Sequence, residues 1–106
     1  MDTSFTWIKR ITEIGLTLMP SKVAKERIDA LMEGSVVHTE KVADLIDECA
    51  AAAEIFVEKN DDRVSAADKE LISTLLGKTD GKEVVTTVEP DELASWVTDL
   101  KQSVQG

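Results

Sequence analysis

Apolar positions repeat every three or four residues over most of this chain, which is the period of an amphipathic α-helix. A first helical segment ends at Pro20, because proline disfavours helical geometry in the residue before it. Its apolar positions are Trp7, Ile8, Ile11, Ile14 and Leu18. A second, shorter helix is expected between a cap at Ser21 and a stop at Gly34. Its inward positions are Ala24, Ile28 and Leu31.

The strongest periodic pattern runs from a cap near Thr39 to Asn60, and we expect this third helix to be the central element. Its inward positions are Val42, Leu45, Ile46, Cys49, Ala53, Phe56 and Val57. A fourth helix should follow Ser65, which forms a variant capping box with Asp68, and should end at Gly77. Its apolar positions are Leu71, Ile72, Leu75 and Leu76.

The stretch "KTDGKEVVTTV" breaks the helical pattern. Asp80 and Gly81 form a turn signal and β-branched residues follow, so a loop or one short strand is expected over residues 82–88. The nearby candidate to pair with such a strand is the stretch around Arg63 and Val64. A fifth helix should open at Glu89 and Pro90, since proline suits the first helical position. Its inward positions are Leu93, Trp96, Val97, Leu100 and Val104.

The pattern therefore predicts a mainly α fold over residues 1–106: a single-domain bundle of about five helices, with at most a short β element near residues 82–88. The 106 residues, 42% hydrophobic and 31% charged, agree with one folded domain. The net charge of −9 arises entirely after Glu33, because residues 1–33 are balanced. Direct nucleic-acid binding is thus disfavoured, whereas a basic protein surface or a cation is favoured as partner.

Few residues suit catalysis. His38 is the single histidine, and no nucleophile stands beside it with a base and an orienting group, so we expect no enzyme and a surface or cap-region histidine. Cys49 is also alone, which rules out an intramolecular disulfide, and its apolar helical face predicts a small buried side chain. A reducing cytoplasm is the expected compartment. Lys9 and Arg10 interrupt the apolar N-terminal stretch, so neither a signal peptide nor a membrane span is expected.

One side of the third helix carries a row of acidic residues opposite the apolar stripe. These are Glu40, Asp44, Asp47, Glu48, Glu54 and Glu58. Several are like-charge neighbours four residues apart, and Glu54 and Glu58 lie near a helix C-terminus, where the helix dipole disfavours anions. The row predicts a small interaction module, regulatory or inhibitory, that binds a basic partner through these residues. A simple solvated face is the alternative.

The segment "CAAAAEIFVEKNDDRVSAADKELISTLL" resembles the TerB-like domains associated with tellurite resistance, over residues 42–77. In those helical domains a helix rich in small residues runs into an acidic segment that opens the next helix. The matching positions here are Asp61, Val64, Ser65 and Asp68. The resemblance implies an acidic surface and a role in stress-linked or membrane-associated assemblies.

The same resemblance implies a divalent-cation site suited to calcium, made by Asp61, Asp62 and Asp68 together with Asn60. The alternative is that these acids only favour the start of the next helix. A third function class also stays open: self-assembly, in which the N-terminal amphipathic helix packs an exposed Phe5 or Trp7 against another copy of the chain.

Overall fold

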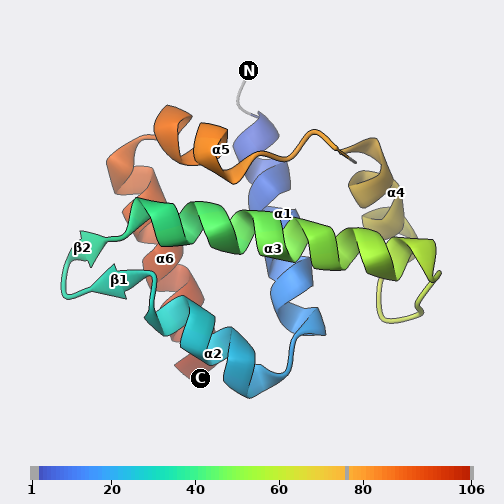
Figure 1. Ribbon diagram of the computed structural model, residues 1–106, viewed down its shortest axis with the longest axis horizontal. Helices are drawn as coiled ribbons and strands as arrows, with labels where there is room; N and C mark the ends of the chain where they lie inside the picture. Colours follow the sequence, from blue (N-terminus) through green and yellow to red (C-terminus); the bar gives the residue numbers. More distant parts are fainter. Residues whose placement is uncertain (1–2, 76, 106) are drawn as a thin grey trace.

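Six helices and one two-stranded hairpin make up the computed structural model, which describes residues 3–75 and 77–105 (Figure 1). The elements are α1 (Thr3–Leu18), α2 (Ser21–Asp29), β1 (Met32–Glu33), β2 (Val36–Val37), α3 (Thr39–Glu58), α4 (Ala66–Thr74), α5 (Gly81–Thr87) and α6 (Pro90–Gln105). The mainly α fold class is confirmed. Among the helices described, none is both long enough and apolar enough to cross a lipid bilayer.

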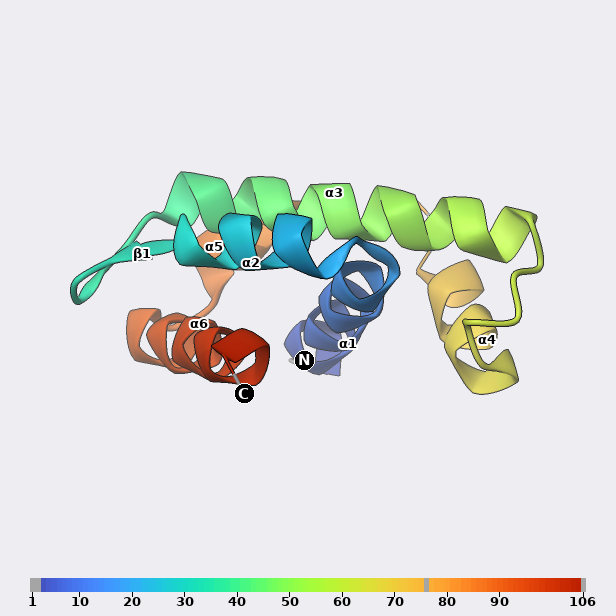
Figure 2. The ribbon, with the colours of Figure 1, turned by 90° about the horizontal axis from the view of Figure 1, so that it is seen from below.

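The helices form two layers. Helix α3 runs across one side of the molecule, with α2 and α5 along its two edges, and α1, α4 and α6 lie on the opposite side (Figures 1 and 2). The extents of 39 × 33 × 18 Å agree with this arrangement, because one helix with its side chains is about 10 Å thick. As expected, α3 is the central element, and its outward side carries no other helix (Figure 2).

Two apolar clusters hold the layers together, and α1 contributes to both. The larger cluster joins α1, α2, α3 and α6 through Phe5, Ile8, Leu16, Ala24, Ile28, Leu31, Val42, Leu45, Ile46, Cys49, Leu93, Trp96, Val97 and Leu100. The smaller cluster lies towards α4 and consists of Ile11, Ile14, Ala50, Ala53, Val64 and Ile72. Between them α1 crosses α3 at close range, because Gly15 lies directly against Cys49.

The ends of α3 and the start of α4 follow the sequence prediction. Asn60 has a left-handed φ of 52°, and its backbone N–H donates to the Val57 carbonyl at 3.0 Å. The N–H of Asp61 donates to the Phe56 carbonyl at 3.1 Å, which completes a Schellman motif. Ser65 caps α4, since its hydroxyl accepts the Asp68 N–H at 3.2 Å.

Residues 82–88 are not a strand or a loop, and this expectation was wrong. Helix α5 covers most of them, because the Asp80 carboxylate accepts the N–H groups of Lys82 and Glu83 at 3.0 and 3.4 Å and so caps a helix. Val84 and Val85 then pack against the larger cluster, which outweighs the β preference of branched residues. Val64, proposed as part of a pairing strand, is instead buried in the smaller cluster.

The short β element lies elsewhere, at the end of α2. This helix stops at Asp29 rather than at Gly34, and Met32–Glu33 pairs antiparallel with Val36–Val37. Gly34 has a φ of +62°, so its left-handed conformation makes the hairpin turn. Ser21 makes no cap, because Pro20 holds the cap position and no side chain bonds there.

The remaining expectations concern two aromatic residues of α1 and the end of α4. Phe5 is buried, not exposed, because its ring packs edge-on against Trp96 with 5.7 Å between ring centroids. Phe5 and Ile8 fill the inward side of the first turn and leave Trp7 45% exposed. Helix α4 ends at Thr74, three residues before the left-handed Gly77. Leu76, expected on the apolar face of α4, lies outside the described residues.

Candidate functional site

The helical period places the six acidic residues predicted on α3 on one side of the helix, which we call the outer face of α3. Figure 2 shows that the side of α3 turned away from α1, α4 and α6 carries no other helix. Five of them are exposed and Glu54 is half-buried. The helix places them there because they fall between the apolar positions that α3 turns towards α1 and α6. The structure then divides them into residues that bind other parts of the chain and residues that do not.

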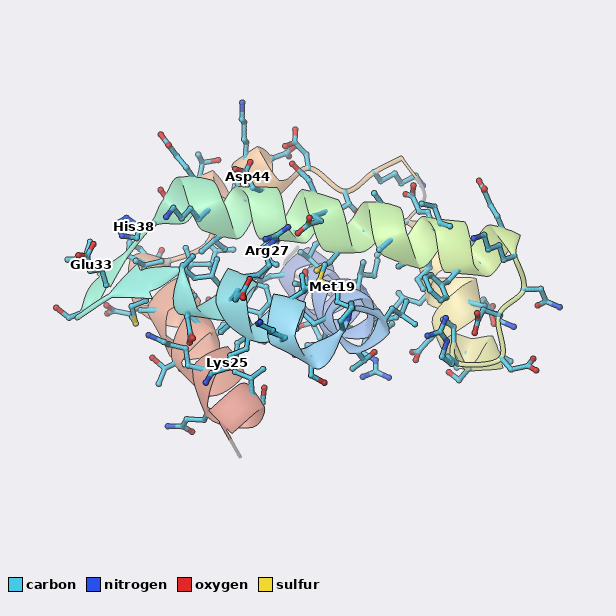
Figure 3. The ribbon with its side chains drawn as sticks, turned by 60° about the horizontal axis from the view of Figure 1, so that its bottom comes forward. Met19, Lys25, Arg27, Glu33, His38 and Asp44 are labelled. Atoms are coloured by element: carbon cyan, nitrogen blue, oxygen red, sulfur yellow. The ribbon has the colours of Figure 1, made fainter. Side chains whose placement is uncertain are left out.

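Glu48 binds Arg27 of α2 with both carboxylate oxygens. The Arg27 Nε and Nη2 atoms donate to Glu48 Oε1 and Oε2 at 3.0 and 3.3 Å, and Figure 3 shows Arg27 reaching from α2 to α3. The hydrogen bonds and the charge of Glu48 raise the pKa of Arg27 above its ordinary value. Glu48 therefore joins α2 to α3, and a partner's cation would have to compete with Arg27 for it.

Asp47 and Glu54 hold the chain that returns to α3 after α4. Asp47 Oδ1 accepts the Gly81 N–H at 2.8 Å, at the first residue of α5. Gly81 lies so close to α3 that a Cβ there would overlap the Ala43 carbonyl oxygen. Glu54 Oε1 accepts the Gly77 N–H at a longer 3.5 Å. Both acids thus have a structural contact that the sequence pattern did not indicate.

Glu40, Asp44 and Glu58 remain exposed, and within the described ranges none of them forms an ion pair. Ile55 lies on the same face, 48% exposed, with Ala51 one turn before it. Sequence reasoning missed Ile55 as a surface residue, although its position between Glu54 and Glu58 on the helix was the signal. The outer face of α3 thus combines free carboxylates with one exposed aliphatic side chain.

Two of the acids after α3, Asp61 and Asp68, bind arginines. Asp61 accepts two bonds of 3.2 Å from the Arg63 guanidinium and one of 2.9 Å from the Arg63 backbone N–H. These bonds lower the pKa of Asp61 below its ordinary value. Arg10 of α1 donates to both oxygens of Asp68, at 2.9 and 3.3 Å.

Two further residues complete the region implied by the TerB-like resemblance. Asn60 Oδ1 accepts the Lys69 ammonium at 2.8 Å, and Asp62 is exposed. Across the described part of the chain, no three His, Cys, Asp or Glu side chains gather closely enough to hold a metal ion. A calcium ion would therefore have to displace Arg63 or Arg10 from its carboxylate, and calcium binding stays a prediction of the resemblance.

His38 and Cys49 have different environments. His38 occupies the cap position of α3 without a capping bond, and its Nε2 lies 3.4 Å from Glu33 Oε2 at the hairpin (Figure 3). Cys49 is buried, as predicted, and burial raises the pKa of its thiol to about 12. Among the described residues, no nucleophile forms a hydrogen bond with His38, and no base forms one with the Cys49 thiol, as nucleophilic catalysis would need.

Comparison of the chain with models of protein families, with curated proteins and with solved structures gave no match.

Proposed function

We propose that this chain is a small acidic interaction module, regulatory or inhibitory, that binds a basic protein surface through the outer face of α3. One observation carries the proposal: Glu40, Asp44 and Glu58 stay exposed on the outer face of α3, without an ion pair in the described ranges. Arg27 and Arg63 form ion pairs with Glu48 and Asp61 and not with these three acids.

The charge of the whole chain supports the same partner. A net charge of −9 on a chain of this size attracts cationic surfaces over roughly a Debye length, about 8 Å at physiological salt. Such attraction raises association rates and disfavours acidic partners. Exposed Ile55 adds an apolar contact near the C-terminal end of the face, and contacts of this kind hold a complex together after the charges have guided it into place.

The test replaces Glu40, Asp44 and Glu58 by lysine together. A matched control makes the same charge change at Glu26, Asp29 and Glu70, which are exposed residues of α2 and α4. Both variants are compared with the unmodified chain in affinity capture from the native host at physiological salt, with the captured proteins identified by mass spectrometry. The proposal expects a basic protein that is captured by the unmodified chain and by the control, and lost with the α3 variant.

Equal loss in both triple variants would show that net charge alone governs the binding. Equal retention in both would remove the outer face of α3 as the binding surface. Thermal melts of the three proteins must agree to within a few degrees, because the comparison assumes that the fold is kept.

A further inference from the structure

Helix α4 lies at one end of α3, away from α2, α6 and the hairpin (Figures 1 and 2). We call α4 and the connection before it, residues 59–75, the α4 strap. Its buried side chains are Val64 and Ile72, and both belong to the smaller apolar cluster. No described apolar side chain of the strap belongs to the larger cluster or packs against it. The strap can therefore move away without removing a side chain from the larger cluster.

The body of the molecule holds the chain on both sides of the strap. Helix α3 precedes the strap and contributes buried residues to both clusters. After the strap, Gly81 lies in close contact with α3 and donates its N–H to Asp47 at 2.8 Å. Residues 59–65 and 77–80 lie between these fixed points and α4, and they are not helical. Backbone changes in these two connections are therefore enough to move α4.

The polar contacts that hold the strap to the rest of the molecule are exposed. Arg10 of α1 donates to both carboxylate oxygens of Asp68, and the Arg10 side chain is 53% exposed. The Arg63 guanidinium lies over the Phe56 ring of α3, 4.6 Å from its centroid. A groove of about 920 Å³ borders Arg10, Arg63 and Asp68, so these groups are open to solvent. Exposed ion pairs contribute little to stability, and the strap therefore depends mainly on its two buried side chains.

We infer that the α4 strap opens as a unit while the larger cluster stays folded, and that the ion pair of Arg10 with Asp68 acts as a latch on it. Elements with few buried apolar contacts open locally in this way. Opening uncovers an apolar surface that the closed form hides. That surface consists of the other buried members of the smaller cluster, Ile11, Ile14, Ala50 and Ala53.

The latch makes this opening sensitive to ionic strength, because salt screens ion pairs between exposed groups. Ionic strength thus controls how often the apolar surface is uncovered. The device is separate from the outer face of α3, since the smaller cluster lies on the inward side of that helix.

Amide hydrogen exchange tests the opening directly. In the unmodified chain, residues 70–75 should exchange at least about tenfold faster than residues 45–49, after correction for intrinsic rates. Low concentrations of urea should accelerate residues 70–75 with a smaller slope than residues 45–49, because the slope follows the surface exposed. Equal rates and slopes would overturn the inference, since α4 would then open only when the whole chain unfolds. Fast exchange without any urea dependence would also overturn it, since that indicates fraying without exposure of the cluster.

Two matched variants test the latch. Arg10→Gln should raise the exchange rate of residues 70–75 about threefold, as expected for loss of an exposed ion pair, and should leave residues 45–49 unchanged. Arg27→Gln removes a pair of the same two-bond kind, with Glu48, and should leave residues 70–75 unchanged. Added salt should accelerate residues 70–75 in the unmodified chain and much less in Arg10→Gln. Equal acceleration of both segments by Arg10→Gln, or none, would show that the pair is not a latch.

A thiol probe gives an independent measurement. Ala53 and Cys49 lie one turn apart on α3 and are both 0% exposed, but Ala53 belongs to the smaller cluster and Cys49 to the larger. In Ala53→Cys, a disulfide reagent should label residue 53 at least about tenfold faster than Cys49, measured by peptide mass spectrometry. Equal labelling would contradict separate opening. Should circular dichroism show that Ala53→Cys does not fold, Val64→Cys repeats the test with a smaller side chain at another buried position of the same cluster.

Discussion

Gly15 of α1 lies against Cys49 of α3 at a distance that only glycine allows. A Cβ placed at residue 15 would lie 2.5 Å from the Cys49 Cβ and 2.7 Å from its carbonyl oxygen. The two backbones therefore approach closely where α1 crosses the central helix. The apolar clusters lie on either side of this crossing, so its geometry affects both.

Gly15→Ala should destabilise the protein. Alanine is favoured over glycine in a helix by about 1 kcal/mol, but here its methyl group overlaps backbone atoms of α3, and overpacking costs typically about 1–3 kcal/mol or more. We expect a lower urea midpoint. Thr6→Ala, at an exposed position of the same helix, serves as the control and should change stability by less than about 0.5 kcal/mol. Equal or higher stability of Gly15→Ala would contradict the close crossing.

The Cys49 thiol should be inert in the folded protein. Desolvation on burial is the main cause that raises its pKa, to about 12, and the charge of Glu48 adds to it. At pH 8 almost no thiolate is present, and the thiolate is the reactive form. A disulfide reagent should therefore modify the native thiol about a hundredfold more slowly than the thiol of the urea-unfolded chain. Comparable rates in the two states would contradict the burial.

Asp47→Ala should release α5 from α3. The substitution removes the 2.8 Å acceptor of the Gly81 N–H, and a hydrogen bond to a charged group contributes about 1.5–3 kcal/mol. Amide exchange should become faster in residues 81–87 than in α1 or α6. Asp44→Ala is the matched control, because Asp44 lies on the same face with no ion pair in the described chain. Similar exchange in the two variants would mean that Asp47 does not hold α5.

The Asp61 carboxyl should titrate below the ordinary aspartate value of about 3.9. The side-chain bonds from Arg63 are the largest cause of its lowered pKa, followed by the Arg63 backbone bond. A lowered folded-state pKa gives stability that is present above the unfolded value and is lost as the pH falls through the folded value. In an NMR titration, Arg63→Gln should move the midpoint upward, and Lys69→Gln, which removes a weaker contribution, should move it less. An unchanged midpoint in Arg63→Gln would contradict the pairing.

Local signals in the sequence identified the elements that depend on local contacts. The Ser65 cap, the end of α3 at Asn60 and the burial of Cys49 follow from residues within one or two turns of each. Helix α5 does have a local signal, the Asp80 cap, but the β-branched residues after it favoured a strand or loop. The contacts that hold this helix in place, Gly81 against Ala43 and Asp47, come from residues more than 30 positions earlier.

The same division applies to the candidate site. The helical period alone places all six acids on the outer face of α3. It does not show that Glu48 binds Arg27, because that contact joins residues 21 apart in sequence. Nor does it show which acids stay unpaired. The sequence therefore predicts a charged surface, and only the tertiary arrangement shows which carboxylates can meet a partner.

The contact between Phe5 and Trp96 has a consequence for biosynthesis. Phe5 is synthesised before the ring that covers it, because Trp96 is added 91 residues later. At about 5–20 residues per second, the interval is roughly 5–18 s, during which the first helix has exposed apolar residues. Chaperones that recognise such segments therefore have time to bind the nascent chain before α6 is complete.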